Sequence, residues 1–374
     1  TGGEAPQKHI KGDTPTSDYQ YPIYGNGAEI YGYADSYRIG QDAVTISSIG
    51  ANTGTIYFRK AFFTPIIRLK VVIPKHSWLL PRYLFHYLSS QTINSKSSSV
   101  PNMNASDVKK LSIPIPCPNN PEKSLAIQSE IVRILDKFTA LTAELTAELN
   151  MRKKQYNYYR DQLLSFDNED VPHLPMGQKD IGEFIRGGTF QKKDFMDAGV
   201  GCIHYGQIYT YYGTYTKKTK THISAALAKK CKKAQKGNLI IATTSENDED
   251  VCKAVAWLGS DDIAVSSDAC IYKHNLNPKY VSYYFQTEQF QNQKRQYITG
   301  AKVRRVNADN LSKILIPVPS MAVQERIVSI LDKFDTLTNS ITEGLPREIE
   351  LRQKQYEYYR DLLFSFPKPE TASN

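Results

Sequence analysis

The chain has 374 residues, 40% of them hydrophobic and 23% charged, and no run approaches the roughly 18 apolar residues of a membrane-spanning helix, so none is predicted. The formal net charge of +9 is uneven: residues 1–119 and 167–319 carry +5 each, whereas residues 120–166 carry +1 and residues 320–374 carry −2. Two basic segments, each followed by a near-neutral one, indicate either a polyanion that is contacted twice or ordinary solubility charge.

The five cysteines are scattered, and none forms a Cys-x-x-Cys pair. An odd number of isolated cysteines, in a sequence that does not begin with a signal peptide, predicts a protein of the reducing cytoplasm.

The first basic segment, residues 1–119, mixes strand and helix patterns. Residues 43–50 (AVTISSIG) and 54–58 (GTIYF) predict two strands joined by a turn, and residues 82–91 (RYLFHYLSSQ) predict a short helix. The double glycine at residues 2–3 matches one at residues 187–188. We therefore expect the N-terminal part of this segment to be missing.

The first near-neutral segment, residues 120–166, is predicted to be one long helix. Its apolar residues recur every three or four positions from Ile127 to Phe166, which makes a single stripe. Within it the tetrapeptide Thr-Ala-Glu-Leu occurs twice in tandem, at Thr142–Leu145 and Thr146–Leu149. Ala, Glu and Leu all favour helix. The tandem is therefore either coiled-coil sequence without a specific role, or a segment whose copy number sets the length of the helix.

The second basic segment, residues 167–319, shows a similar plan in a different sequence. Residues 237–244 and 262–267 predict strands, and residues 279–290 (KYVSYYFQTEQF) predict a helix. Residues 227–237 (LAKKCKKAQKG) predict a solvated basic helix face rather than a specific contact with the polyanion. The acidic run at residues 246–250 (ENDED) is typical of a solvated loop rather than a metal site.

The second near-neutral segment, residues 320–374, repeats the first. ILDKF occurs at 134–138 and 330–334, and RKKQYNYYRDQLLSF (152–166) matches RQKQYEYYRDLLFSF (352–366). We expect the two apolar stripes to pack on each other, antiparallel. Gly344 and Pro346 predict a kink or break in the second helix. The predicted fold is α+β, with two globular bodies, two long helices and internal pseudo-twofold symmetry.

Catalytic motifs are absent from the sequence. It contains no Gly-Lys of a phosphate-binding loop, no Gly-x-Gly-x-x-Gly, no His-Glu-x-x-His, and no Pro-Pro as found in the catalytic loop of amino-methyltransferases. The seven histidines do not cluster at ligand spacing. The chain is predicted not to be an enzyme, and to hold no metal.

Candidate DNA contacts lie where basic residues alternate with tyrosines and small polar residues. Arginine can read guanine and asparagine can read adenine, but the same side chains also contact phosphates, and the pattern leaves both roles open. The candidates are Tyr31, Tyr33, Arg38, Asn52, Lys96, Ser98, Asn102, Lys217, Lys218, Lys220, Lys302, Arg304 and Arg305.

The repeated blocks resemble a known family. IPIPCP (113–118), IQSEIVRILDKF (127–138) and RKKQYNYYRDQLLSF (152–166), with their second copies, are similar to the conserved regions of the specificity subunit of type I restriction–modification enzymes. The TAEL tandem and the ending REIELRQKQYEYYRDLLFSFPKPE (347–370) resemble the type IC subgroup.

The resemblance implies a non-catalytic subunit whose two basic segments are target recognition domains, each reading one half of a split, asymmetric DNA site. It implies two methylation (HsdM) subunits as partners, which bring S-adenosylmethionine and methylate adenine at N6. Motor–nuclease (HsdR) subunits, which use ATP and Mg²⁺, complete the restriction complex. A specificity subunit of a different methyltransferase–nuclease system, or a coiled-coil scaffold that does not bind DNA, remain alternatives.

Two further roles are predicted for the helices. The TAEL residues Thr142, Leu145, Thr146 and Leu149 would set the distance between half-sites, since four residues add about 6 Å of helix. The tyrosines of the matched tails either dock methylation subunits or pack within the chain. They are Tyr156, Tyr159, Tyr356 and Tyr359.

Overall fold

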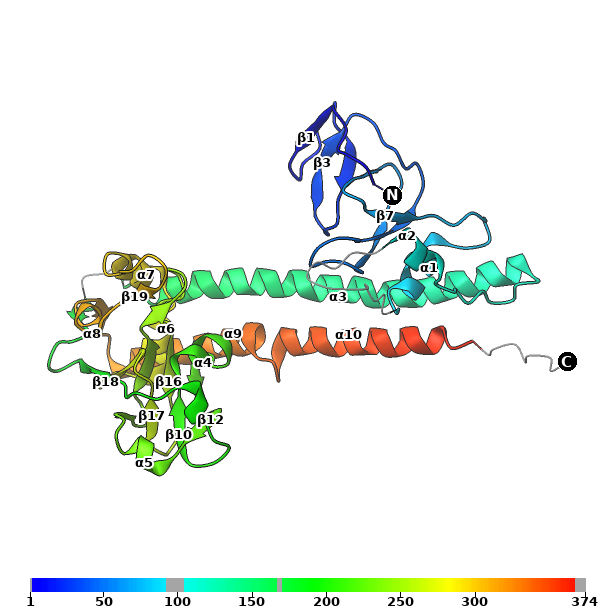
Figure 1. The fold of residues 1–374 in the computed structure, drawn as a ribbon. Coiled ribbons are helices and arrows are strands. Elements are labelled where there is room, and N and C mark those ends of the chain that lie inside the picture. The colour runs from blue at the N-terminus through cyan, green and yellow to red at the C-terminus, as the bar shows by residue number, and fades with distance from the viewer. Residues whose placement is uncertain (1, 92–103, 167–169, 367–374) are drawn as a thin grey trace. The chain divides into compact units, whose positions relative to one another are not determined.

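The computed structural model describes residues 2–91, 104–166 and 170–366. The chain divides into two compact units (Figure 1). Unit 1 comprises residues 1–145 and 349–374, and unit 2 comprises residues 146–348. Both boundaries fall inside long helices, α3 (Pro121–Leu163) and α10 (Gly344–Leu363). The boundary in α3 lies between the two TAEL copies.

Unit 1 builds two small sheets beside its helices. One sheet has the strand order β1-β3-β2-β6 and the other has the order β5-β4-β7. The elements are β1 (His9–Lys11), β2 (Tyr21–Tyr24), β3 (Ile30–Ala34), β4 (Ala43–Ile46), β5 (Ile56–Arg59), β6 (Thr64–Pro65), β7 (Lys70–Val72), α1 (Pro81–Leu88) and α2 (Ala105–Lys109), with the unit's parts of α3 and α10.

Unit 2 contains a four-stranded sheet, β12-β10-β17-β13, a five-stranded sheet, β11-β16-β14-β18-β9, and the two-stranded pairs β15-β19 and β20-β8. Its strands are β8 (His173–Pro175), β9 (Gly182–Arg186), β10 (Val200–Ile203), β11 (Tyr215–Thr216), β12 (Thr221–Ile223), β13 (Lys233–Ala234), β14 (Leu239–Ala242), β15 (Thr244–Ser245), β16 (Ala254–Trp257), β17 (Ile263–Val265), β18 (Ala269–His274), β19 (Arg304–Arg305) and β20 (Leu315–Pro317). Its helices are α4 (Tyr205–Thr210), α5 (Ala225–Ala228), α6 (Pro278–Tyr284), α7 (Glu288–Arg295), α8 (Ala308–Leu311) and α9 (Met321–Asn339), with a 3₁₀ turn at Lys192–Asp194.

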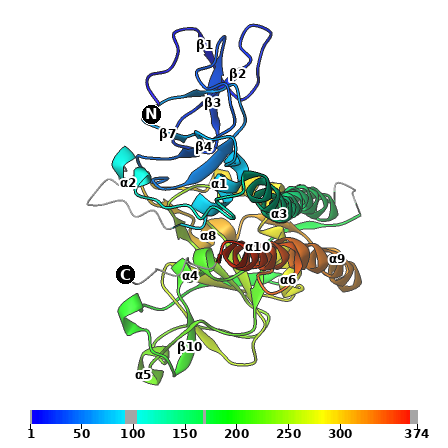
Figure 2. The ribbon, with the colours of Figure 1, turned by 90° about the vertical axis from the view of Figure 1, so that its right-hand side faces the viewer.

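The five-stranded sheet of unit 2 is buried on both faces. Successive residues of a strand point to opposite sides, so Leu239 and Ile241 of β14 pack with the helices. Ile240, between them, packs with Ile203 and Val265 of the other sheet. Figures 1 and 2 show the result: β10 and α5 lie on the side of the unit away from α9. The mixed helix and sheet content confirms the predicted α+β class.

A helix of each body is fastened to the long helices by an aspartate of the repeated ILDKF. In unit 1, Asp136 Oδ1 accepts from Arg82 Nε at 2.8 Å and lies 2.7 Å from His86 Nε2. In unit 2, Asp332 accepts from Lys279 Nζ at 2.6 Å and from the Tyr283 hydroxyl at 2.7 Å. We call these groups the unit 1 clasp and the unit 2 clasp.

The long helices also contact each other within each unit, running antiparallel (Figure 1). The ring of Phe138 stacks on that of Tyr359 in unit 1, at 5.4 Å between centroids, and Phe334 stacks on Tyr159 in unit 2, at 5.7 Å. These contacts confirm the predicted antiparallel packing. The stripes are not covered by each other alone, however, because Tyr83 of α1 packs on Ile131 and Leu135 of α3.

In both units the double glycine allows two backbone segments to approach closely. Gly3 bridges Ile66, and Gly188 bridges Ser266, both parallel. A Cβ on Gly2 would lie 2.7 Å from the Ile66 carbonyl oxygen, and one on Gly187 would lie 2.1 Å from that of Ser266. Only glycine permits this approach of two backbones.

Three predicted helical features can be compared with the structure. The break at Gly344 and Pro346 is confirmed, since α9 ends at Asn339 and α10 begins at Gly344, whose φ is +78°. The single helix predicted over 279–290 is instead two, α6 and α7, because the Thr287 hydroxyl accepts from the Phe290 amide and starts a new helix. None of the described helices is long and apolar enough to cross a bilayer.

The basic helix face predicted over 227–237 is wrong. Helix α5 ends at Ala228, and Lys233 and Ala234 form strand β13, which pairs with β17. Ala234 is fully buried. The burial of this small residue in the sheet stabilises the strand, which a pattern dominated by lysines does not reveal.

Candidate nucleic-acid interface

A cleft of about 290 Å³ lies in unit 2 where turns from five parts of the chain meet. Its walls come from the end of β9, the β14–β15 junction, the turn before β18, the residues before α8, and β19. The polar side chains that line it include Arg186, Thr243, Ser267, Asp268, Arg305 and Asn307. We call it the β15–β19 cleft. It brings together donors and a carboxylate, the groups that read base edges.

The wall carrying Arg305 is a short hairpin. Thr299 and Arg305 exchange two backbone hydrogen bonds, each 2.9 Å long. Gly300, at φ +91°, makes the turn, and a Cβ there would lie 2.1 Å from the Val303 carbonyl oxygen. Lys302 is exposed in the loop between them. The turn at Gly300 thus projects a basic loop that carries the predicted candidates Lys302, Arg304 and Arg305.

The two adjacent arginines of this hairpin have different surroundings. Arg304 Nε lies 2.8 Å from Asp248 Oδ1, and its Nη1 donates to the Gly300 carbonyl at 2.6 Å. The guanidinium of Arg305 is exposed and has no hydrogen-bond or ion-pair partner among the described residues. Arg304 therefore holds the hairpin, while Arg305 is available to a ligand. The DNA contact of Arg305 stays a prediction, and the bonds that Arg304 makes within the chain favour a structural role for it.

The acidic loop that anchors Arg304 is itself anchored by a buried lysine. Lys294 Nζ donates to the carbonyl oxygens of Asp248 at 2.8 Å, Glu249 at 3.1 Å and Val251 at 2.8 Å. Burial lowers the pKa of Lys294. The acidic side chains of residues 246–250 are exposed, as predicted for a solvated loop. Within the described ranges, no group of three metal-binding side chains occurs.

The lysines of the second predicted basic stretch lie elsewhere in unit 2. Lys217, Lys218 and Lys220 are exposed on the segment between β11 and β12 and do not line the cleft. The ammonium of Lys220 sits 4.6 Å from the centroid of the Tyr211 ring, which is 56% exposed. A cation over an exposed ring offers both a charge and a stacking surface. Their DNA role remains a prediction.

The candidates of unit 1 are divided between surface and interior. Tyr31, Arg38 and Asn52 are exposed. Tyr33 is 7% exposed, and its hydroxyl donates to the Asp13 carbonyl at 3.1 Å, so its ring packs rather than reads DNA; this corrects the prediction for Tyr33. Lys96, Ser98 and Asn102 lie outside the described residues.

Arg68 in unit 1 is a functional candidate that the sequence did not indicate. The matching glycine pairs place it where unit 2 has Asp268, two residues after the bridged Ile66 and Ser266. Arg68 is exposed, at φ +56°. No local motif marks this position, because the strands around it differ in sequence between the units.

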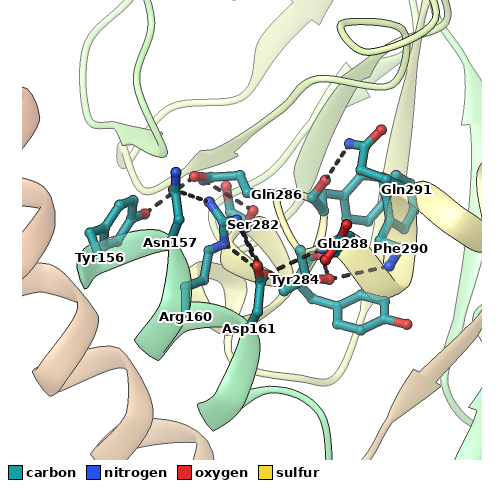
Figure 3. Close-up of polar contacts among 12 residues, drawn as sticks. Tyr156, Asn157, Arg160, Asp161, Ser282, Tyr284, Gln286, Glu288, Phe290 and Gln291 are labelled. Carbon is teal, nitrogen blue, oxygen red and sulfur yellow. Dashed lines mark hydrogen bonds and ion pairs between the residues drawn. The ribbon is translucent and has the colours of Figure 1, made fainter. Parts of the chain in front are cut away.

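The tyrosines of the matched tails fall into two groups. Tyr156 is 4% exposed and its hydroxyl donates to Gln286 at 3.2 Å, while Tyr356 is 7% exposed and contacts His86 (Figure 3 shows Tyr156). These two rings pack within their units, so of the two alternatives left open for them, packing rather than docking holds. Tyr159 and Tyr359 remain 46% and 42% exposed, and their docking role stays a prediction.

The C-terminal end of α3 is joined to unit 2 by further polar contacts near the start of α7 (Figure 3). Asp161 Oδ1 accepts from the Glu288 amide at 3.2 Å, and Arg160 bonds to Asp161 and to Asn157. Two tyrosines that were not among the predicted docking residues, Tyr158 and Tyr358, are 61% and 65% exposed. Both stand next to a predicted docking residue, and the matched repeat could have indicated them.

Comparison with known proteins gives one family. A family model described as the type I restriction modification DNA specificity domain matches residues 3–152 and 175–351. The specificity subunit of the type I restriction enzyme EcoR124I/EcoR124II from Escherichia coli is 46% identical over 297 residues, covering 79% of this chain and 73% of that protein. A putative type I restriction enzyme specificity subunit of Haemophilus influenzae is 34% identical over 307 residues, covering 76% and 72%.

Solved structures share the fold at low sequence identity. A structure described as the basis of complex assembly and conformational transition of the type I restriction–modification system has a TM-score of 0.60 at 13% identity, covering 92% of this chain and 91% of that one. The crystal structure of a type I restriction–modification S subunit from M. genitalium has a TM-score of 0.51 at 15% identity, covering 99% and 93%.

Proposed function

Because this chain belongs to the family of type I restriction–modification specificity subunits, we propose that each of its units reads one half of a bipartite, asymmetric DNA site. The observation that carries this is the matched architecture of the two units. The same glycine approach and the same aspartate clasp occur in each, around bodies with different exposed side chains. A pair of similar readers with unlike surfaces suits a split site with unlike halves.

The chain supplies recognition, and its partners supply the chemistry. We infer that two methylation subunits bind it, carrying S-adenosylmethionine, and that motor–nuclease subunits with ATP and Mg²⁺ join the full complex. The exposed pairs Tyr158/Tyr159 and Tyr358/Tyr359 support docking on the tails, since exposed neighbouring tyrosines are typical of protein interfaces. The five free cysteines fit a reducing cytoplasm.

The TAEL tandem is proposed to set the half-site spacing. Thr142, Leu145, Thr146 and Leu149 lie on α3 where unit 1 gives way to unit 2, and none of them is buried. A surface segment of helix can gain or lose a turn without disturbing a core. This position supports a role in length rather than in packing.

Mapping methylated adenines tests the function directly. The chain would be co-expressed with methylation subunits in a host that lacks other adenine methylation, and the genome sequenced for modified bases. We expect one bipartite motif with two unlike halves and a fixed spacer. Scattered methylation with no motif would contradict the reader function, and no DNA protection in a footprint of the same complex would favour the scaffold alternative.

A further inference from the structure

We propose that the β15–β19 cleft reads a G·C base pair, with the Arg305 guanidinium donating to guanine and the Asp268 carboxylate accepting from cytosine. This inference rests on the proposed DNA-reading function and assigns one base pair of the half-site to unit 2. Arginine is suited to the O6 and N7 acceptors of guanine, and aspartate to the N4 amino group of cytosine. The two bases of one pair present these groups side by side in the major groove.

The first step is that both side chains are available. Neither Arg305 nor Asp268 has a side-chain hydrogen bond or ion pair within the described part of the chain, although both line one cleft. Arg304, the neighbour of Arg305, is occupied by Asp248 and the Gly300 carbonyl. The hairpin therefore uses one arginine to fix its shape and leaves the other for a ligand.

The second step is that the charges of the cleft fit a base pair better than a phosphate. A phosphate site collects donors, and a carboxylate in it would repel the anion. The cleft is lined by Asp268 as well as by Arg305 and Arg186, and the hydroxyl-bearing Thr243 and Ser267 line it too. This mixture of donors and acceptors matches the edge of a base pair, which also carries both.

The third step is that the walls are held in place by backbone hydrogen bonds. The Thr243 amide donates to the Asp268 carbonyl at 2.9 Å, and the Val306 amide donates to the Thr243 carbonyl at 3.1 Å. Thus the turns that carry Asp268 and Arg305 are both tied to the β14–β15 junction. Fixed walls reduce the ordering that binding requires, and so raise the discrimination that each contact can give.

The other unit supports a difference between the half-sites. Unit 1 has the exposed Arg68 at the position of Asp268, so an acceptor in one unit is replaced by a donor in the other. A donor cannot accept from the cytosine amino group. Unit 1 is thus expected to prefer a different base at the corresponding step, as an asymmetric site requires.

Selection from a random DNA library tests the assignment. The full chain, co-expressed with methylation subunits, is used as wild type and as the variants Arg305→Ala, Arg305→Lys, Asp268→Asn and Lys302→Ala, and the bound DNA is sequenced. Arg305→Ala should relax one G·C position of one half-site by a factor between about 5 and 150. Asp268→Asn keeps an acceptor oxygen but loses the charge and gains an amide donor, so it should relax the same position less than Arg305→Ala does. Arg305→Lys keeps the charge and should relax it too, because lysine lacks the two-pronged fork.

Lys302→Ala is the matched control, since Lys302 is on the same hairpin but outside the cleft lining. It should weaken binding to all sequences alike and leave the preference unchanged. If Arg305→Ala and Arg305→Lys keep every base preference of the wild type, the cleft does not read a base and the inference is overturned while the reader function stands. If the wild type itself selects no sequence, both are overturned. Trp257 fluorescence, from a buried ring in unit 2, reports whether each variant is folded.

Discussion

His86 Nδ1 lies 3.0 Å from the hydroxyl oxygen of Tyr356, although 270 residues separate them in the chain. The other ring nitrogen of His86 lies 2.7 Å from Asp136 Oδ1. His86 is the sixth residue of α1, and the sixth residue of α6 is Tyr283, whose hydroxyl donates to Asp332. The two clasps are thus built alike, but only the one in unit 1 contains a histidine.

The unit 1 clasp should make that unit sensitive to acid. Burial lowers the pKa of His86 from its ordinary value near 6.5, with Arg82 and Arg360 acting in the same direction and Asp136 opposing them. As the pH falls below about 6.5, the unfolded chain binds a proton that the folded clasp resists, so the free energy of unfolding decreases with falling pH. His86→Gln should reduce this dependence and cost some stability at pH 7.

Each unit contains one of the two tryptophans, which allows the units to be followed separately. Trp78 reports on unit 1 in a Trp257→Phe background, and Trp257 reports on unit 2 in a Trp78→Phe background. Urea unfolding at pH 7.5 and pH 5.5 gives the comparison. Burial also lowers the pKa of His274 in unit 2, to about 4. The stability of unit 2 should therefore also decrease with falling pH, and its pH dependence, which His86→Gln should not alter, serves as the reference. An equal pH dependence of the Trp78 signal with and without His86 would rule out the clasp as its source.

Asp332 should contribute more to the stability of unit 2 than either of the two groups that donate to it. Asp332→Ala leaves the Lys279 ammonium and the buried Tyr283 hydroxyl without their acceptor, at a cost of about 3 kcal/mol. Tyr283→Phe removes only one neutral donor and should cost about 1 kcal/mol. Urea unfolding followed by Trp257 measures both. A smaller effect for Asp332→Ala than for Tyr283→Phe would show that the ion pair contributes nothing.

The conformation of the acidic loop (residues 246–250) should depend on the buried ammonium group of Lys294. Lys294→Met removes donors from three carbonyl oxygens and should destabilise unit 2 by about 3 kcal/mol. Hydrogen exchange should rise first in residues 246–252 and in the hairpin at 299–305, because Asp248 links the two. Lys313→Met, on the exposed surface, is the control and should change neither. If hydrogen exchange in the hairpin stays unchanged in Lys294→Met, the hairpin does not depend on the acidic loop for its stability.

The exposed tail tyrosines should be needed for assembly, and Tyr159 and Tyr359 also stack on Phe334 and Phe138 within the units, so folding of each variant is checked by urea unfolding. Tyr158→Ser with Tyr159→Ser, and the matched pair Tyr358→Ser with Tyr359→Ser, should each reduce co-purification of one methylation subunit, since aromatic residues dominate binding energy at interfaces. Native mass spectrometry counts the bound subunits. Tyr156→Phe is the comparison: it should lower stability slightly and leave assembly intact. Full assembly in both double variants would place the docking surface elsewhere.

Deleting Thr146–Leu149 should change the accepted spacer and leave both half-sites unaltered. The deletion shortens α3 by about 6 Å and rotates the remainder of the helix by about 40°. A base-pair step is about 3.4 Å, so a change of one or two base pairs of spacer is expected. Methylation of a plasmid set that varies only in the spacer provides the measurement. Equal methylation of the original site would mean that the tandem is filler.

The sequence predicted the helical framework well because its signals are periodic and repeated. The stripe from Ile127 onward and the second ILDKF copy mark α3 and α9, and Gly344 marks the break. The strand at 233–234 and the division of the predicted 279–290 helix were missed, because each depends on a tertiary contact or a single capping hydroxyl.

The candidate site was only partly predictable from residue type. Basic residues mark the surface, but nothing in the run Arg304–Arg305 reveals that Asp248 binds one and not the other. Asp268 was not a candidate, because a single acidic residue after a strand has no distinctive pattern. Tyr33 and Tyr156 looked like contact residues, and their burial depends on loops and helices far away in the sequence.

The discontinuity of unit 1 has a consequence for the order of synthesis. Unit 2 is one continuous stretch, residues 146–348, whereas unit 1 needs the segment after residue 348 to cover Ile131 and Leu135 with Tyr356. At about 5–20 residues per second, roughly 200 residues of waiting amount to about 10–40 s. Until Tyr356 is made, the unit that is started first has an open apolar face, whereas the chain of unit 2 is complete once residue 348 is made. We expect nascent chains arrested before Tyr356 to be cleaved in unit 1 and spared in unit 2.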